Sequence, residues 1–179
     1  MKNLFIAVIL GIVFAGVSLA QPSKVKVAVV EFSPAPNTSV MTYEAKRHLQ
    51  ASLAYALNET KRFHVVDVRN TREASQSDLA TLNGSSSTAA AVKLGKQLGV
   101  SYVVTGTVVE YTPKGADSFG LLILKTRFIE VATGKVKHEG EMTQRSTSVM
   151  RTDNAAEMHT RTVRPALEKL AATLAGLTL

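Results

Sequence analysis

Hydrophobic positions along the chain follow two periods, one typical of buried strands and one typical of amphipathic helices. Lys24–Phe32 and Tyr102–Tyr111 are rich in β-branched and apolar side chains, which predicts strands inside a sheet. Tyr43–Asn58 and Thr88–Leu98 carry apolar residues at helical spacing, so each is expected to pack one face on a core. Phe63–Val68 predicts a further short strand between these two helices.

Proline, glycine and serine set the expected ends of these elements. Ser33–Asn37 contains two prolines and is expected to end the first strand, because proline has no N–H to donate to a ladder. Gly99 stands where a left-handed residue would close the second helix. Gly106, inside its strand, indicates a bulge or the close approach of another backbone. Arg69–Ser87 is polar and long for a bare loop, so a helical turn near Asp78–Leu82 is expected.

Leu121–Val131 and Lys135–Arg145 predict a hairpin whose register follows from its two faces. A three-residue loop with Gly134 in the left-handed conformation pairs Val131 with Lys135. One face of the hairpin then becomes apolar and the other salt-paired, which predicts a sheet that the helices cover incompletely. The expected pairs are Arg127 with Glu139, Lys125 with Glu141, Phe128 with His138, and Leu124 with Met142.

The carboxy-terminal segment Asn154–Leu177 has apolar residues near helical spacing, and Pro165 inside it predicts a kink or a restart. The element order is therefore β-α-β-α-β-β-β-α. The β-α units imply right-handed crossovers and parallel strands, and the hairpin implies antiparallel strands as well. The expected fold class is α/β (an α+β sandwich), with one mixed β-sheet, helices packed on the sheet, and a single globular domain over residues 21–179.

Residues 1–20 have the pattern of a secretory signal peptide. Lys2 provides a positive charge, Leu4–Val17 is apolar, and small residues precede a cleavage site after Ala20. An uncleaved membrane anchor is the alternative, but the apolar run is short for the about 20 residues that span a bilayer. No later segment reaches about 18 consecutive apolar residues, so no transmembrane segment is expected in the mature chain.

The composition limits the classes of function. The chain of 179 residues has no cysteine, which excludes disulfides, thiolate metal sites, a cysteine nucleophile and a lipidated cysteine. The net charge of +7 favours solubility and allows contact with anionic lipid or cell-wall polymer. Because the basic residues are spread along the sequence, with no zinc-finger spacing and no aromatic–basic RNA motif, nucleic acid is not an expected partner. No cofactor or small-molecule ligand is indicated.

The polar residues offer one weak catalytic pattern and one candidate surface. His64 lies near Asp67 and could orient a base in a hydrolase, but no hydroxyl nucleophile stands in a G-x-S-x-G context. No two histidines have the H-x-x-x-H spacing of a zinc protease. We therefore assign no catalytic, cofactor-binding or metal-binding residue. The candidate interaction surface, with a merely solvated face as the alternative, is the charged hairpin face of Lys125, Arg127, Lys137, Glu139 and Glu141.

Two segments carry a resemblance to a known family: LGVSYVVTG at Leu98–Gly106 and VATGK at Val131–Lys135. With the strand that ends in AVVEF and the segment KRFHVVDV, the chain resembles the CsgG family and its relatives over residues 25–146. These relatives include the LpoB-type activators of penicillin-binding proteins and the TolB amino-terminal domain. The resemblance implies an α/β sandwich and a non-enzymatic role in the cell envelope. Thr112–Gly120 is too short for the membrane-spanning hairpins of CsgG itself, so pore formation is not expected.

The leading hypothesis is an exported accessory protein in the periplasm or at the outer-membrane periphery. It would dock to another envelope protein or associate with itself. The first alternative is a soluble ring-forming subunit of an envelope secretion or surface-appendage apparatus. The second alternative is a hydrolase that uses His64 and Asp67.

Overall fold

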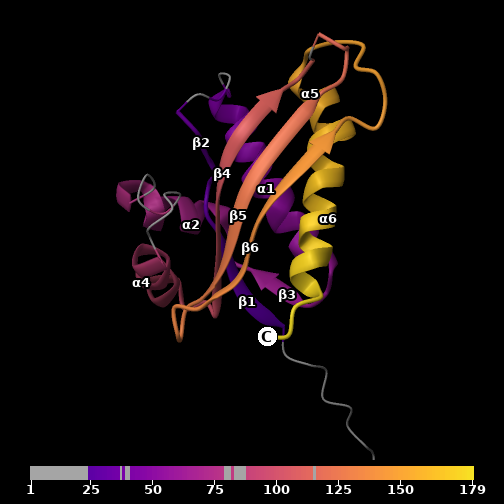
Figure 1. Ribbon diagram of the computed structural model, residues 1–179. Helices are drawn as coiled ribbons and strands as arrows, with labels where there is room; N and C mark the ends of the chain where they lie inside the picture. Colours follow the sequence, from indigo (N-terminus) through magenta and orange to yellow (C-terminus); the bar gives the residue numbers. More distant parts are fainter. Residues whose placement is uncertain (1–23, 37, 39–40, 79–81, 83–87, 115) are drawn as a thin grey trace, which may run out of the picture.

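The computed structural model describes residues 24–36, 38, 41–78, 82, 88–114 and 116–179 (Figure 1). The predicted signal peptide, residues 1–20, lies outside the described residues, as does most of the helical turn expected at Asp78–Leu82. The other predictions for the fold fall on described segments.

A mixed six-stranded sheet forms the centre of the molecule, which confirms the expected fold class. Its strands follow the order β3-β1-β4-β5-β6, and the short strand β2 pairs with β4 beyond the end of β1. The pairs of β1 with β3, β1 with β4 and β2 with β4 are parallel, whereas β4, β5 and β6 are antiparallel. The strands are β1 Val25–Val29, β2 Ser33–Pro34, β3 Phe63–Val65, β4 Tyr102–Thr112, β5 Leu121–Glu130 and β6 Val136–Arg145.

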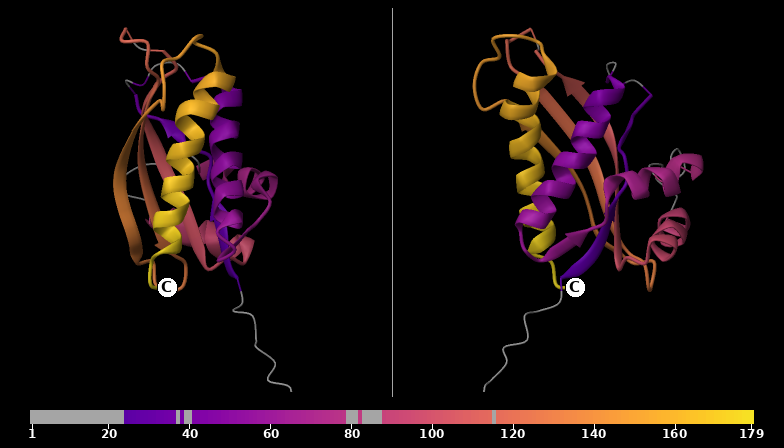
Figure 2. Two further views of the ribbon diagram at one scale, coloured as in Figure 1. Left: turned by 90° about the vertical axis from the view of Figure 1, so that its right-hand side faces the viewer. Right: turned by 180° about the vertical axis from the view of Figure 1, so that it is seen from behind.

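Helices cover both faces of this sheet, and each face has its own core (Figure 2). On one face α1 (Tyr43–Glu59) and α6 (Arg164–Ala175) lie side by side. On the other face α2 (Val68–Ser75) and α4 (Thr88–Leu98) cover β1 and the adjoining ends of β4 and β5. Successive residues of β1 therefore point into different cores, which explains the continuous apolar run in its sequence.

The expected end of the first strand at Ser33–Asn37 is wrong. After a short break the chain pairs again with β4, with Ser33 opposite Thr107 and Pro34 opposite Val108. The ladder bond comes from the N–H of Ala35, which donates to the carbonyl of Val108 at 2.8 Å. Because neighbouring N–H groups of a strand point to opposite sides, this pairing needs no N–H at Pro34.

The polar segment after β3 forms a helix that the hydrophobic pattern does not predict. The strand ends at Val65, and the side chain of Asp67 accepts the N–H of Arg69 at 2.8 Å as the N-cap of α2. Only Thr71 and Ser75 of this helix are buried, so α2 has no apolar stripe to reveal it. A short 3₁₀ turn, η1 (Gln76–Asp78), continues α2.

The hairpin has the predicted register over most of its length. Lys125 lies opposite Glu141, Arg127 opposite Glu139, and Phe128 opposite His138. The loop itself differs, because Glu130 rather than Val131 bonds with Lys135, and the loop has four residues instead of three. A one-residue bulge follows in β6 and restores the predicted register. Gly134, as expected, has a positive φ of 71°.

The carboxy-terminal helical segment changes its helical form just before Pro165, where the sequence predicts a kink or a restart. It consists of α5 (Ala155–Met158), a π-helical turn η2 (His159–Val163) and α6, with Pro165 in the first turn of α6. Because Pro165 has no N–H, the carbonyl of Arg161 is left without a partner in the helix. That carbonyl accepts the N–H of Thr147 at 2.9 Å, which ties the helix to the segment after β6.

Candidate interaction surface and neighbouring pockets

The charged hairpin face contains the two cross-strand ion pairs that the register predicts. The Nζ atom of Lys125 lies 3.5 Å from the carboxylate of Glu141, and the Nε atom of Arg127 lies 4.0 Å from that of Glu139. The side chains of Lys125, Glu139 and Glu141 are 63, 68 and 49% exposed. These three side chains form the open part of the face, and an exposed pair such as Lys125 with Glu141 stabilises a fold by only about 0–1 kcal/mol.

Arg127 is enclosed, unlike its neighbours. Its side chain is only 14% exposed, and one guanidinium nitrogen donates to the hydroxyl of Thr88 at 2.8 Å. Thr88 is the first residue of α4, so this bond ties the helix to the sheet. Arg127 thus joins the charged hairpin face mainly as a structural anchor.

Lys137 does not pair with Glu139 or Glu141. It lies at the bulge, where its Nζ atom is 3.8 Å from the carboxylate of Glu130. Glu130 also accepts hydrogen bonds from the hydroxyls of Thr133 and Tyr102. The Thr133 bond and the nearby charge of Lys137 lower the pKa of Glu130, whereas burial and then Glu130 itself raise the pKa of Tyr102. The four-residue loop therefore moves Lys137 out of the predicted cluster and into this group.

Strand β6 forms one edge of the sheet. It is 10 residues long, and no described strand pairs with its free side. Alternate residues of this strand are exposed through most of its length. At the end of β6, Arg145 pairs with Asp117 at 2.6 Å and lies over the ring of Phe119. The open charged face and the unpaired edge thus adjoin each other.

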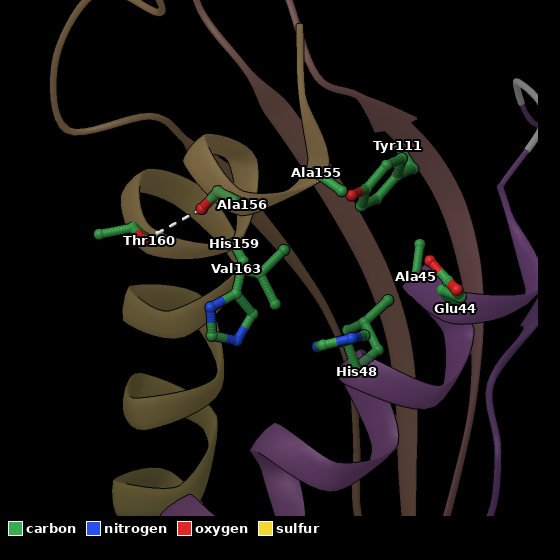
Figure 3. Close-up of a pocket in the computed structure, with 10 residues that line it drawn as sticks. Glu44, Ala45, His48, Tyr111, Ala155, Ala156, His159, Thr160 and Val163 are labelled. Carbon is green, nitrogen blue, oxygen red and sulfur yellow. Dashed lines mark hydrogen bonds between the residues drawn. The ribbon is translucent and has the colours of Figure 1, made fainter. Parts of the chain in front are cut away.

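A pocket of about 370 Å³ lies between α1 and the π-helical turn (Figure 3). His48 from α1 and His159 from the π-helical turn point toward each other, with ring centroids 6.2 Å apart. The Nε2 atom of His159 is 2.7 Å from the hydroxyl of Ser52. Burial, and then the nearby charges of His48 and Arg164, lower the pKa of His159. Sequence reasoning missed this cluster because its members come from distant segments.

The contact of Ser52 with His159 is incomplete as a catalytic arrangement. A serine hydrolase also needs a group that orients the second histidine nitrogen, and an oxyanion hole. Among the described residues, no carboxylate hydrogen-bonds to His159. The weak pattern of His64 and Asp67 gives no catalytic pair either: His64 is exposed on β3, and Asp67 caps α2. In the described part of the chain, no group of three His, Asp or Glu residues is placed to hold a metal ion.

Comparisons with known proteins identify the fold but not a family. The sequence matches no protein-family model and no curated protein. Within the described residues, none of the helices has the length and apolar character needed to span a bilayer.

Similar folds occur among solved structures. The hypothetical protein CT253 from Chlamydia trachomatis is similar with a TM-score of 0.62 at 9% identity, covering 86% of this chain and 97% of that one. Lipoprotein GNA1162 from Neisseria meningitidis has a TM-score of 0.52 at 18% identity, and the alignment covers 84% of this chain and 94% of that one. A PelC dodecamer from Paraburkholderia phytofirmans, solved as a point variant, has a TM-score of 0.52 at 18% identity. The alignment covers 83% of this chain and 89% of that one.

A structure of LpoB, which the sequence resemblance names, is also among the similar structures. The LpoB C-terminal domain from Salmonella enterica aligns with a TM-score of 0.45 at 19% identity, covering 66% of this chain and 81% of that one. The fold assignment rests on the other three structures, which align more closely. The CsgG and TolB parts of the resemblance stay predictions.

Proposed function

We propose that the protein is an exported, non-enzymatic accessory protein of the cell envelope that acts by binding other proteins. The signal-peptide pattern of residues 1–20 supports export to the periplasm or the outer-membrane periphery. The sequence resemblance and the fold shared with lipoprotein GNA1162 support a place in the envelope. The observation that carries the binding role is the open charged hairpin face beside the unpaired edge of β6.

This surface has the physical properties of a protein-binding site. A long edge strand offers free backbone donors and acceptors, and alternating charges limit its pairing to partners of matching charge. The ion pair of Lys125 with Glu141 is exposed and weak, so these two charges can turn to a partner at little cost to the fold. The bond of Arg127 to Thr88 holds the base of the face in place during such an exchange.

A second candidate function is that of a soluble ring-forming subunit. One observation favours it: the similar structure of PelC is a dodecamer. In such an assembly, the partner of the charged hairpin face would be another copy of this chain. Light scattering of the purified protein distinguishes the two candidates, because a ring has a defined multimeric mass and the accessory protein binds a different polypeptide.

Charge reversal tests the binding role. In Glu139→Lys combined with Glu141→Lys, the hairpin face becomes uniformly positive, and like charges across an interface cost several kcal/mol. We expect this variant to lose at least about tenfold in affinity for the protein captured from envelope extracts, or to lose the multimer. The matched control, Glu59→Lys with Glu168→Lys, reverses two exposed helix carboxylates, each in one ion pair, and should behave like the wild type.

Two results contradict the proposal. One is a wild-type protein that is strictly monomeric and captures no specific envelope protein. The other is an equal loss of binding in both double variants, which would assign the effect to overall charge instead of the hairpin face. Circular dichroism of each variant establishes that the fold is intact.

A further inference from the structure

A second crevice lies at the carboxyl end of β1, where the chain reverses its direction of winding. From β1 the chain passes through α1 to β3 on one side, whereas β4, on the other side, is reached through α2 and α4. Helix α1 and the pair α2 and α4 lie on opposite faces of the sheet (Figure 2). Open α/β sheets bind ligands in the crevice at such a switch point. In this protein the crevice has a volume of about 460 Å³.

Three arginines converge on this crevice from two helices. Arg47 comes from the first turns of α1, and Arg69 and Arg72 come from α2. Basic residues that are spread along the sequence therefore lie together at this place. Arg47 lies over the exposed ring of Tyr43, with 5.2 Å between the guanidinium carbon and the ring centroid, which restricts its position at the rim.

The guanidinium groups of these three arginines make no salt bridge with another described residue. By contrast, five of the six other arginines bind a carboxylate or a backbone carbonyl within the described residues. Those are Arg62, Arg127, Arg145, Arg161 and Arg164. Guanidinium groups bind phosphate through paired N–H donors, so three arginines that line one crevice offer donors suited to such an anion.

Two carboxylates line the same crevice and limit the kind of anion that fits. Glu31 is 8% exposed at the end of β1, and Glu73 lies on α2. A bare anion would be repelled by both, but hydroxyl or amino groups on a larger ligand can donate to them. The volume of the crevice also exceeds what a single phosphate fills and lies in the range of small-molecule sites.

We propose that this arginine crevice binds the phosphate group of a small organic phosphate ester that also carries hydroxyl or amino groups. Arg47, Arg69 and Arg72 hold the phosphate, and the two glutamates accept hydrogen bonds from the rest of the ligand. The phosphate ester is either a free molecule or the head group of a phospholipid. This site is separate from the charged hairpin face and does not depend on the proposed function.

Calorimetric titration of the purified protein with glycerol 3-phosphate tests the free ester. Sedimentation with phosphatidylglycerol vesicles, against phosphatidylcholine vesicles, tests the lipid head group. We expect saturable binding to at least one probe. Because Arg69→Ala combined with Arg72→Ala removes charge-assisted hydrogen bonds to the phosphate, this variant should weaken binding at least about tenfold. Lys96→Ala with Lys169→Ala removes the same charge from exposed positions elsewhere and should leave binding within about twofold of wild type.

A charge-conserving variant distinguishes the effect of the guanidinium geometry from that of the overall positive charge. Arg47→Lys with Arg69→Lys keeps both charges but removes the planar forks, so binding should weaken while the net charge stays the same. Two results overturn the proposal: no binding to either probe, or an equal loss in the crevice variant and the lysine control. Binding to vesicles alone, lost with Arg69→Ala and Arg72→Ala, supports the head group as the ligand.

Discussion

Glu157 links the segment after β6 to the carboxy-terminal helix. Its carboxylate accepts the N–H groups of Arg151 at 3.0 Å and Thr152 at 2.8 Å, and it pairs with Arg161 at 2.9 Å. The backbone hydrogen bonds from Arg151 and Thr152 are the main causes that lower its pKa to about 2 from an ordinary 4.5. In this way one side chain orders the turn that leads into α5.

The low pKa of Glu157 predicts a specific acid sensitivity. Between pH 4.5 and about 2 the unfolded chain binds a proton at this residue and the folded chain does not, so folding stability falls as the pH falls. Glu157→Gln removes this linkage and also weakens the turn. We expect the variant to be less stable at pH 7 and to lose less further stability on acidification. Urea unfolding across a pH series measures the stability at pH 7 and its loss on acidification. If the stability of variant and wild type fell in parallel with pH, the low pKa of Glu157 would be contradicted.

Strand β4 depends on a glycine where another backbone comes close. A Cβ atom on Gly106 would lie 2.7 Å from the carbonyl oxygen of Lys125 and 3.0 Å from the ring of Phe32. A backbone carbonyl in a sheet cannot move aside without disturbing its ladder. From the position of glycine inside a strand, the sequence predicted either a bulge or such a close approach, although not the identity of the neighbour.

Gly106→Ala should therefore destabilise the protein by about 1–3 kcal/mol, the usual cost of overpacking. Gly140→Ala is the matched control, because a Cβ atom there meets only the ring of His138, at 3.3 Å, and a side chain can turn away. Urea denaturation of both variants gives the comparison. Equal stability of the two variants would show that the strands around Gly106 adjust freely.

The success of prediction differs between elements for physical reasons. The hairpin register was predictable because a shift would mix apolar and charged faces. The bulge at Lys137 was not predictable. It follows from a four-residue loop, and the turn sequence does not distinguish such a loop from a three-residue one. Helix α2 was missed because it buries only Thr71 and Ser75 and begins at an aspartate cap instead of an apolar stripe.

At the scale of the molecule, the described helices on the two faces leave one region of the sheet open. The charged hairpin face and the edge of β6 lie in that region, as the salt-paired pattern of the hairpin indicated. The arginine crevice could not be found in this way. Arg47 and Arg69 are far apart in the sequence, and only the strand order and the opposite placement of α1 and α2 bring them together.

Crosslinking in intact cells tests most directly whether the charged hairpin face binds a protein. A photoreactive amino acid at Glu139, which is 68% exposed, is compared with the same amino acid at Glu168, which is 54% exposed on α6. We predict a discrete crosslinked product from position 139, to a second copy of the chain or to one other envelope protein, and none from position 168. No product from position 139, or the same products from both positions, would contradict the account.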